Sequence, residues 1–336
     1  MRAKAEPLVS AVIATYNRGS VVGEAIESIL SQTYQNVEVI VVDDGSTDDT
    51  HEKLKRYSER IRVVWQTNAG PAAAWNRGII ASNGEVIAFL GSDDLWLPTF
   101  VERQVSLLQR LGEGVPCCVA NCCCRFATGR VTTSFDEARL RTDVEEGKWL
   151  NVAEVLVTRF VVFGQAVAVR RAALERAGGF DERLRFLEDY DLALRLSVQG
   201  PWGFIREPLV VWRQGADSLS REALRDWAHL YELAIEVRER ALCELWDGEE
   251  SAGVRALLTR GLKGVRRMLQ ARRMRERNNR IAAGLGSMLL LAERVRAGLF
   301  RRSSSYPQMV VAGLESSLCV DSSSDQTEDG GTCQRL

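Results

Sequence analysis

The stretch Val37-Glu38-Val39-Ile40-Val41-Val42-Asp43-Asp44-Gly45-Ser46 decides the fold. Its first six residues form an apolar, β-branched run, which is typical of a buried strand. Acidic and turn-forming residues follow directly, so the strand is expected to end at Asp43-Asp44. A helix is expected next, over about 48–60, with Ser46 or Thr47 as its N-cap. A strand that passes straight into a helix predicts one unit of an α/β fold.

The same alternation continues on both sides of this stretch. Four alternations of strand and helix within about 90 residues predict a mostly parallel central sheet flanked by helices. Such sheets bind their ligands at the carboxyl ends of the strands. A second strand also runs into acids there, through Gly91-Ser92 to Asp93-Asp94. The remaining strands are expected at 8–14, 61–65 and 85–90, and the remaining helices at 21–31 and 71–81.

Beyond residue 94 the pattern is less regular. We expect a strand at 115–126, a polar irregular stretch at 130–150, an apolar segment at 161–170, a short helix at 171–177 and an amphipathic helix at 188–198. Helical composition then extends over 222–300, and the last residues are rich in serine without periodicity. The predicted organisation is an α/β domain over 1–221, a helical basic extension over 222–302 and a disordered, acidic, Ser-rich tail over 303–336.

Charge is distributed unevenly along the 336 residues. The segment 255–302 holds 14 Lys and Arg against 2 acids, although the whole chain carries a net charge of −1. The near-neutral balance argues against a nucleic-acid partner. Apolar runs fall short of the roughly 20 residues that a spanning helix needs. Five of the eight cysteines cluster in 117–124, unlike a secreted disulfide framework, so a cytoplasmic protein is expected.

Three acidic pairs are the main candidates for chemistry. Asp93-Asp94 at a strand end offers hard oxygen ligands for Mg²⁺ or Mn²⁺, although a solvated loop with a helix cap has the same sequence. Asp43-Asp44 could accept hydrogen bonds from a base or a ribose, although Asp-Gly is also common in turns. Glu188-Asp189 opens a helix, where acids complement the helix dipole or act as a general base.

Six short motifs occur in a fixed order and together resemble the family 2 glycosyltransferases. The resemblance covers about residues 8–220 and implies a GT-A fold. The motifs are Ala14-Thr15-Tyr16-Asn17, Val41-Val42-Asp43-Asp44-Gly45-Ser46, Asn68-Ala69-Gly70 with Asn76-Arg77-Gly78, Phe89 to Asp94, Gly178-Gly179-Phe180-Asp181-Glu182 and Glu188-Asp189-Tyr190-Asp191-Leu192.

The resemblance implies an inverting transfer of a sugar from a nucleotide diphosphate donor, usually a UDP-sugar, to a hydroxyl of a saccharide or lipid-linked acceptor. A role in cell-surface polysaccharide or glycolipid synthesis and a divalent cation, Mn²⁺ or Mg²⁺, are implied with it. In this family pattern, Asp189 is the base that deprotonates the acceptor and Asp94 binds the metal. The implied donor-binding residues are Tyr16, which packs on the base, Asp43, which accepts the uracil N–H, Asp93, near the ribose, and Thr15, Asp44, Asn68, Gly70 and Asn76.

Two positions depart from the family pattern. Gly91 stands where many relatives have a third acid, and Gly215 stands where many have a metal-contacting histidine. Weak metal binding, completed by diphosphate and water, is one consequence. A catalytically silent binding or scaffold module is the alternative function, and a nucleotidyltransferase is a second one, disfavoured by the lack of a glycine-rich basic phosphate loop.

Two further features have competing interpretations. The cluster Cys117, Cys118, Cys122, Cys123 and Cys124 lacks the paired spacing of zinc sites, and buried thiols on a strand are the expected alternative. The arm 255–302 has leucines at helical spacing among its arginines. It is expected either to pack on the catalytic domain or to contact an anionic membrane surface peripherally.

Overall fold

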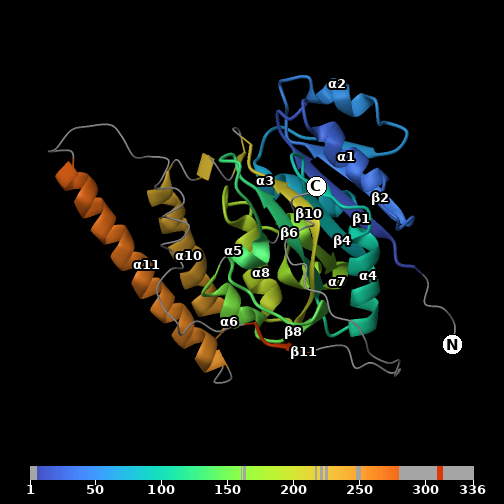
Figure 1. The fold of residues 1–336 in the computed structure, drawn as a ribbon. Coiled ribbons are helices and arrows are strands. Elements are labelled where there is room, and N and C mark those ends of the chain that lie inside the picture. The colour runs from blue at the N-terminus through green and yellow to red at the C-terminus, as the bar shows by residue number, and fades with distance from the viewer. Residues whose placement is uncertain are drawn as a thin grey trace.

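The structure is a computed structural model that describes residues 6–159, 161, 164–215, 218–219, 222–223, 226–246, 251–279 and 309–312. An 11-stranded sheet forms its centre, in the order β11-β8-β10-β6-β9-β4-β1-β2-β3, with β5 paired to β10 and β7 to β6. Figure 1 shows helices on both faces of this sheet. The strands are β1 (Val9–Thr15), β2 (Val37–Asp43), β3 (Arg62–Trp65), β4 (Val86–Gly91), β5 (Leu95–Trp96), β6 (Cys117–Arg125), β7 (Val131–Thr133), β8 (Glu146–Trp149), β9 (Val167–Arg170), β10 (Trp202–Arg213) and β11 (Val311–Ala312).

The N-terminal half of the sheet is parallel, as predicted. β1 pairs with β2 and β4, and β2 pairs with β3, all in parallel. The register aligns Thr15 with Asp43, and Ala14 with Gly91. Because parallel strands end at the same edge, this register brings the segments after β1, β2 and β4 together.

The prediction of a mostly parallel sheet is wrong for the other half. β9 runs antiparallel to both β4 and β6, and β8 runs antiparallel to β10, whereas β10 and β6 are parallel. The stretch 130–150, predicted as irregular, contains β7, a short helix and β8. The sequence analysis predicts no strand at 202–213, where the 12-residue β10 lies. The pairing of β10 with β5, β6 and β8 joins segments that are far apart in sequence, and periodicity does not reveal such pairing.

The helices predicted at 21–31, 71–81, 171–177 and 188–198 are present, and α4 (Phe100–Leu111) and α6 (Val152–Leu156) are helices that the sequence analysis did not predict. The helix expected over about 48–60 is only six residues long, and its N-cap is Asp49 rather than Ser46 or Thr47. The Ser46 hydroxyl instead accepts a hydrogen bond from the Asn17 backbone N–H, at 2.9 Å. The helices are α1 (Val22–Leu30), α2 (Thr50–Lys55), α3 (Pro71–Ala81), α4 (Phe100–Leu111), α5 (Ser134–Glu137), α6 (Val152–Leu156), α7 (Arg171–Ala177), α8 (Glu188–Ser197), α10 (Trp227–Glu244) and α11 (Ala252–Asn279), with a 3₁₀ turn, η1 (Gly164–Ala166).

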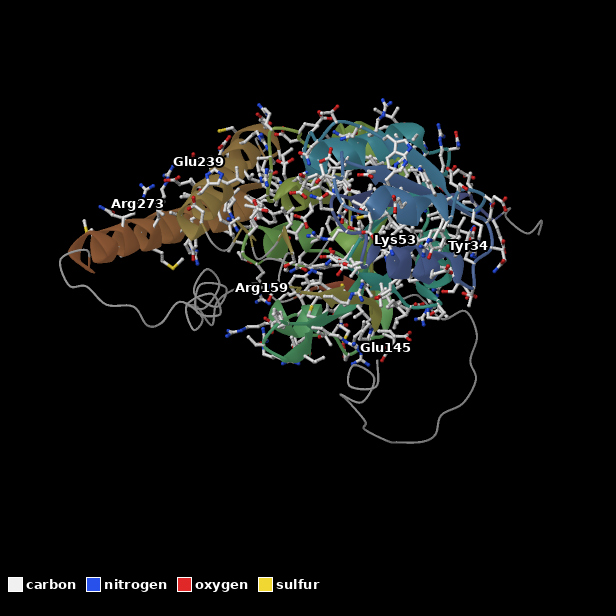
Figure 2. All side chains as sticks on the ribbon, turned by 90° about the horizontal axis from the view of Figure 1, so that it is seen from above. Tyr34, Lys53, Glu145, Arg159, Glu239 and Arg273 are labelled. Atoms are coloured by element: carbon white, nitrogen blue, oxygen red, sulfur yellow. The ribbon has the colours of Figure 1, made fainter. Side chains whose placement is uncertain are left out.

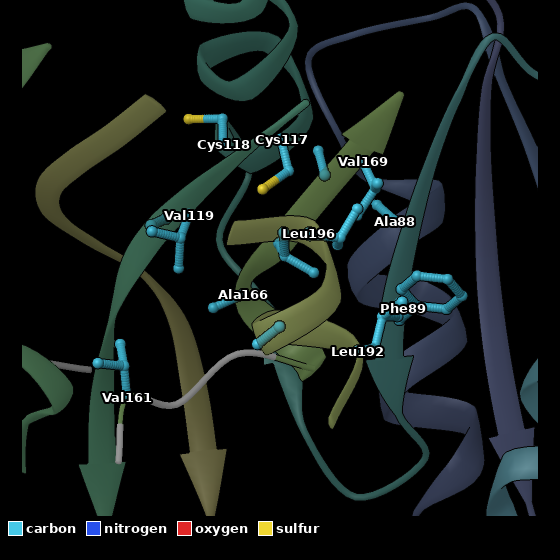
Figure 3. Close-up of a cluster of buried hydrophobic side chains, with 14 of the residues drawn as sticks. Ala88, Phe89, Cys117, Cys118, Val119, Val161, Ala166, Val169, Leu192 and Leu196 are labelled. Atoms are coloured by element: carbon cyan, nitrogen blue, oxygen red, sulfur yellow. The ribbon is translucent and has the colours of Figure 1, made fainter. Parts of the chain in front are cut away.

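The clustered cysteines belong to the hydrophobic core. Figure 3 shows Cys117 and Cys118 on opposite sides of β6, with Cys117 turned toward Leu196 of α8. Burial raises the pKa of both thiols well above the ordinary value, which makes them poor metal ligands. Cys122 and Cys124 are also free and buried, whereas Cys123 is disulfide-bonded. The expectation of buried thiols therefore fits four of the five residues.

The C-terminal extension forms a helix pair at one end of the molecule. Figure 1 shows α10 between α11 and the α/β body, and Figure 2 shows Glu239 and Arg273 on this pair, at the opposite end from Tyr34. The apolar stripe of α11, including Leu258, Leu262 and Val265, is buried. The described part of the arm therefore packs on the protein, while the predicted helix beyond residue 279 lies outside the described residues.

One segment of the predicted disordered tail is ordered. β11 pairs antiparallel with β8, and Val311 lies opposite Trp149. The Leu150 backbone N–H donates to the Val310 carbonyl at 2.8 Å. The apolar residues Met309, Val310 and Val311 extend the sheet edge, so disorder was the wrong prediction for 309–312. Most of the tail lies outside the described residues. No helix among the described residues is long and apolar enough to cross a bilayer.

Candidate active site

A cavity of about 690 Å³ lies at the carboxyl ends of β1 and β4. Its wall comes from the segments after these strands and from the N-terminal ends of α3 and α8. α10 supplies the remaining side. The wall includes eight of the ten predicted site residues, namely Thr15, Tyr16, Asp44, Asn68, Gly70, Asp93, Asp94 and Asp189. The two that do not line it are Asp43 and Asn76.

Asp44 is fixed as an acceptor on the cavity wall. Its carboxylate accepts hydrogen bonds from Gln66 Nε2 at 2.7 Å, from the Ala69 backbone N–H at 2.8 Å and from the Gly70 backbone N–H at 2.9 Å. Gly70 precedes α3 with a φ of 93°, a conformation that favours glycine. The helix dipole of α3 thus faces this carboxylate and stabilises its charge. A carboxylate accepts about four hydrogen bonds, so one acceptor position remains.

Asp43, which the family pattern implies as the uracil acceptor, does not line the cavity. It ends β2, is only 1% exposed, and its Oδ1 accepts the Ser46 backbone N–H at 2.8 Å. This hydrogen bond stabilises the turn that follows the strand. Neighbouring residues of a strand point to opposite sides, and the sequence alone does not tell which of two adjacent acids faces the ligand. The structure places Asp44 there, not Asp43.

Asn76 joins two motifs rather than lining the cavity. Its Nδ2 donates to the Phe180 carbonyl at 2.9 Å, and its Oδ1 accepts the Phe180 backbone N–H at 2.8 Å. Gly179 has a φ of 72°, which favours glycine, and a Cβ there would lie 2.7 Å from the Asn76 Oδ1. Asn76 therefore holds the Gly178-Gly179-Phe180 turn against α3, and its expected donor contact does not fit this position.

The end of β1 contributes an exposed ring and a buried hydroxyl. Tyr16 is 44% exposed at the cavity wall, although large aromatic side chains are usually buried. Thr15 is 2% exposed, and its hydroxyl has no hydrogen-bond partner among the described residues. A buried hydroxyl without a partner is unfavourable unless a ligand supplies one. Both residues therefore suit contact with a bound molecule.

The Asp93-Asp94 pair is held by the end of β10. Asp94 Oδ1 accepts the Arg213 backbone N–H at 2.8 Å, and the Arg213 side chain donates to the Asp93 carbonyl and to Glu24. Burial raises the pKa of Asp94 well above its usual range, and the neighbouring charge of Asp93 raises it further. Burial also raises the pKa of Asp93. Two adjacent buried carboxylates therefore repel each other unless a proton or a cation neutralises them.

This pair fits a divalent cation in charge and in ligand type. Carboxylate oxygens suit Mn²⁺ and Mg²⁺, and a cation would relieve the repulsion between Asp93 and Asp94. Among the described residues, no group of three or more His, Cys, Asp or Glu is placed to hold a metal. Gly215, at the expected histidine position, is exposed and has no side chain to offer. Phosphate oxygens and water would have to complete the coordination.

Glu188 and Asp189 begin α8 on another side of the cavity. The preceding residue, Leu187, has a φ of 64°, which is unusual for a leucine and indicates local strain. Asp189 Oδ1 accepts the backbone N–H of Tyr190 at 2.7 Å. Burial raises the pKa of Asp189, and burial together with the charge of Asp189 raises the pKa of Glu188 to about 8. Two buried, adjacent carboxylates thus begin this helix, and burial disfavours the charged form of each.

Several wall residues have no signal in the sequence motifs. Ser218 is 5% exposed, and its hydroxyl lacks a partner among the described residues. Leu230, Ala234 and Arg238 line the cavity from α10. Arg240, also on α10, donates to Asp191 of α8 at 2.5 Å. The predicted domain boundary at 221/222 therefore separates residues that line one cavity. The sequence indicated that residues beyond 222 are helical, but it did not indicate that α10 faces the cavity.

A family comparison agrees with this geometry. Residues 10–171 match the family model "Glycosyl transferase family 2". Over this stretch, just under half of its length, the chain is similar to glycosyltransferase family 2. The match favours a glycosyltransferase domain over the nucleotidyltransferase alternative. It ends before Asp189 and α10, so these parts of the cavity are assigned from the structure.

Relatives and solved structures with the same fold extend further along the chain. An uncharacterized glycosyltransferase of Rickettsia prowazekii is 29% identical over 65% of this chain and 67% of its own length. One of Rickettsia typhi is 32% identical over 55% of this chain and 57% of its own length. This chain therefore spans between half and two thirds of these relatives.

Two solved glycosyltransferase structures share the fold with the glycosyltransferase domain. S. aureus TarS in complex with UDP-GlcNAc has a TM-score of 0.60 and 18% identity, over 75% of this chain and 71% of its own. A mannosyltransferase of Pyrobaculum calidifontis, in complex with GDP-Man and Mn²⁺, has a TM-score of 0.56 and 20% identity, over 89% and 82%. The GT-A fold predicted for this chain is thereby confirmed.

The glycosyltransferase domain is expected to be sensitive to a side chain at Gly91. A Cβ there would lie 2.8 Å from the Asp94 Oδ2 and 3.3 Å from the Asp93 Oδ1. Gly91→Ala should therefore displace the acid pair and weaken Mn²⁺-dependent UDP binding by about tenfold, if one charge-assisted contact is lost. Calorimetry measures this loss, with Gly112→Ala as a control for stability at a glycine far from the pair. Unchanged Mn²⁺ dependence in Gly91→Ala would show that the acids tolerate the displacement.

The raised pKa of Glu188 predicts a pH-dependent stability of the glycosyltransferase domain. Its folded pKa of about 8 exceeds the ordinary value of 4.5 for a glutamate, so the folded state loses stability as pH rises between these values. Glu188→Gln should remove this cost and raise the Tm relative to wild type at pH 8.5, but not at pH 5. Each 1 kcal/mol corresponds to about 2–4 °C in a domain of this size. A Tm difference that is the same at both pH values would contradict the assignment.

Proposed function

We propose that this chain is an inverting glycosyltransferase that moves a sugar from a UDP-sugar donor to a hydroxyl of a saccharide or lipid-linked acceptor. One observation carries the proposal. Asp93-Asp94 and Glu188-Asp189, nearly a hundred residues apart in sequence, line the same cavity. A single displacement needs charge stabilisation at the leaving diphosphate and a base at the acceptor, and the two acid pairs supply groups of these types.

The donor is proposed to bind where β1, β2 and α3 meet. Tyr16 offers a ring for stacking on the base, and Asp44 has an acceptor position for the uracil N–H. The buried Thr15 hydroxyl would gain its missing partner from the donor. The glycosyltransferase structures that share the fold were solved with UDP-GlcNAc and with GDP-Man, which supports a nucleotide-sugar donor in general. The choice of uridine rests on Asp44.

The acceptor hydroxyl is proposed to meet Asp189. Burial raises the pKa of Asp189, which brings this carboxylate closer to the working range of a general base. Asp189 takes the proton from the hydroxyl as the oxygen attacks the sugar, which inverts the configuration at the sugar carbon. Asp94, with Asp93 beside it, would hold Mn²⁺ or Mg²⁺, which when bound neutralises the charge of the diphosphate.

Nucleotide affinity tests the donor site. Calorimetry with UDP, GDP and CDP should show the tightest binding for UDP, and Asp44→Asn should weaken UDP by about 10- to 100-fold through loss of a charged acceptor. Asp43→Asn is the matched control, because its carboxylate serves a turn: it should lower the Tm and leave UDP affinity unchanged. Loss of uridine affinity in Asp43→Asn alone would return the role to Asp43.

A catalytically silent module remains the alternative function, because Gly91 and Gly215 stand where many relatives have an acid and a metal-contacting histidine. Such a module would bind UDP without releasing sugar from any donor. We further propose a role in cell-surface polysaccharide or glycolipid synthesis at the cytoplasmic face of the membrane. This placement is supported by the basic arm, whose exposed face carries Arg260, Lys263, Arg266, Arg267 and Arg273.

Peripheral membrane binding through this face should be electrostatic. The apolar stripe of α11 is buried in the protein. Arg266 and Arg273 form ion pairs with Glu239 and Glu232 of α10. The other exposed cations, Arg260, Lys263 and Arg267, are the groups most available to anionic lipids. Each Lys or Arg near such a surface contributes about 1 kcal/mol. The chain should co-sediment with anionic vesicles at low salt and be released at 1 M salt, where the Debye length is about 3 Å.

A charge-reversal variant completes the membrane test. Arg260→Glu combined with Arg267→Glu should reduce co-sedimentation severalfold, because it changes two exposed cations of α11. Neutral vesicles are the matched control for non-specific attachment. If the wild-type chain stays in the supernatant with anionic vesicles at low salt, the arm serves only to pack on the domain.

A further inference from the structure

Arg238 of α10 is a buried cation on the cavity wall. It is only 4% exposed and lines the cavity together with Leu230 and Ala234. Its Nη1 donates to the Ala234 carbonyl at 3.2 Å, and its guanidinium carbon lies 5.0 Å from the centre of the Tyr190 ring. These contacts hold the side chain against α8, where Glu188 and Asp189 begin the helix.

None of these contacts supplies a negative charge. Among the described residues, no carboxylate lies within ion-pair distance of Arg238. Other cations of this region are paired: Arg185 contacts Glu222 at 2.8 Å, and Arg240 contacts Asp181 at 2.6 Å. A buried guanidinium normally has an anionic partner, because removing the charge from water is costly. A ligand in the cavity could be that partner.

The position of Arg238 associates it with the acceptor rather than with the donor. The proposed donor contacts come from residues 15–94, whereas Arg238 stacks on Tyr190, the residue that follows the proposed base. Leu230, Ala234 and Arg238 are spaced by four residues, so they share one face of α10 and turn it toward the cavity. Along this face of α10, two apolar side chains are followed by the cationic side chain of Arg238.

We propose that Arg238 is an anion subsite for the acceptor, which therefore carries a phosphate or carboxylate group near the hydroxyl that receives the sugar. The inference rests on the proposed function and specifies its acceptor class. Arg has five N–H donors in a planar arrangement that matches phosphate and carboxylate oxygens. Two other arginines, Arg18 and Arg185, also line this cavity, and Arg185 is paired with Glu222. Arg238 is the buried one, and it lies beside the residue that follows the proposed base.

Paired charged and uncharged probes test this subsite. The full chain is saturated with UDP and Mn²⁺, so that the donor site is filled, and then titrated with octyl phosphate against octanol, and with glucose 6-phosphate and glucuronate against glucose. At least one anionic probe should bind about 10- to 100-fold more tightly than its uncharged partner, as expected for a charge-assisted hydrogen bond. The preferred pair tells whether the anion belongs to a lipid, a sugar phosphate or a uronate.

Three variants assign the preference to this side chain. Arg238→Gln should abolish the difference between charged and uncharged probes, while Arg238→Lys should keep part of it. Arg266→Gln removes an exposed cation of α11, outside the cavity, and should leave the preference unchanged. If Arg238→Gln does not fold, the subsite is tested by two other measurements: the preference of the wild type for charged probes, and the partial preference expected of Arg238→Lys.

Contradicting results are distinguishable from one another. Equal affinity of the wild type for charged and uncharged probes, with UDP bound normally, would overturn the subsite and leave the proposed function intact. A loss of UDP affinity in Arg238→Gln would make Arg238 a donor-phosphate group and overturn the acceptor assignment. A wild-type chain that binds no UDP would contradict the proposed function, and the acceptor class with it.

Discussion

Asp189→Asn is expected to abolish sugar transfer while leaving UDP affinity nearly unchanged. The amide keeps the shape of the side chain, and its oxygen can still accept the Tyr190 backbone N–H. It cannot take a proton from the acceptor hydroxyl, and general-base catalysis contributes about 10²- to 10⁴-fold to rates. We therefore expect turnover to fall by about 10³-fold. Turnover is measured by release of UDP in the presence of acceptor, and affinity by calorimetry.

A matched control separates catalysis from helix stability. Glu52 is an exposed acid in the first turn of α2, where it can serve the helix dipole but lies outside the cavity. Glu52→Gln should change the Tm slightly and leave turnover intact. If Asp189→Asn retains turnover within a fewfold of wild type, Asp189 is only a helix-start residue, and Glu188 or Asp191 becomes the base to test.

Asp94→Asn is expected to remove most of the dependence of UDP affinity on Mn²⁺. In the wild type, UDP should bind more tightly with Mn²⁺ or Mg²⁺ than with EDTA, because a cation would neutralise both the buried acids and the diphosphate. Asparagine keeps an acceptor for the Arg213 N–H but loses the charge. The affinity of Asp94→Asn for UDP is expected to be about 10- to 100-fold lower than that of the wild type with Mn²⁺, and nearly the same with EDTA.

The Arg213 contact provides the control for this experiment. Glu24→Gln removes the carboxylate that pairs with Arg213 without altering the acid pair itself. It should leave the Mn²⁺ dependence in place. Equal UDP affinity of the wild type with Mn²⁺ and with EDTA would exclude the metal role of Asp94.

Two strands of the parallel half could be predicted with their ligand-facing ends, because they are apolar runs followed closely by acids. Val37–Asp43 and Val86–Gly91 carry this pattern, and the structure brings their ends to one cavity. The choice between Asp43 and Asp44 could not be made, because both follow the same strand and only the turn decides which one faces the cavity. Asn76 was likewise placed near the donor by its motif, although its partners are in the turn at Phe180.

The second half of the sheet and the α10 wall depend on contacts that are distant in sequence. β8 is four residues long and is completed by β11, more than 150 residues later in the chain. Arg238 is one of many arginines in a helical segment, and nothing local marks it as buried. Its position follows from the packing of α10 on α8, where Arg240 pairs with Asp191. Such tertiary contacts cannot be read from periodicity alone.

Release of UDP from a panel of nucleotide sugars is the most direct test of the central claim. The full chain with Mn²⁺ is incubated with UDP-glucose, UDP-galactose, UDP-GlcNAc and GDP-mannose, and nucleotide diphosphate is measured for the wild type and for Asp189→Asn in parallel. We predict release from at least one UDP-sugar by the wild type and none above background by the variant. Binding of UDP without release from any donor, with equal traces for both proteins, would contradict the claim and establish the silent module.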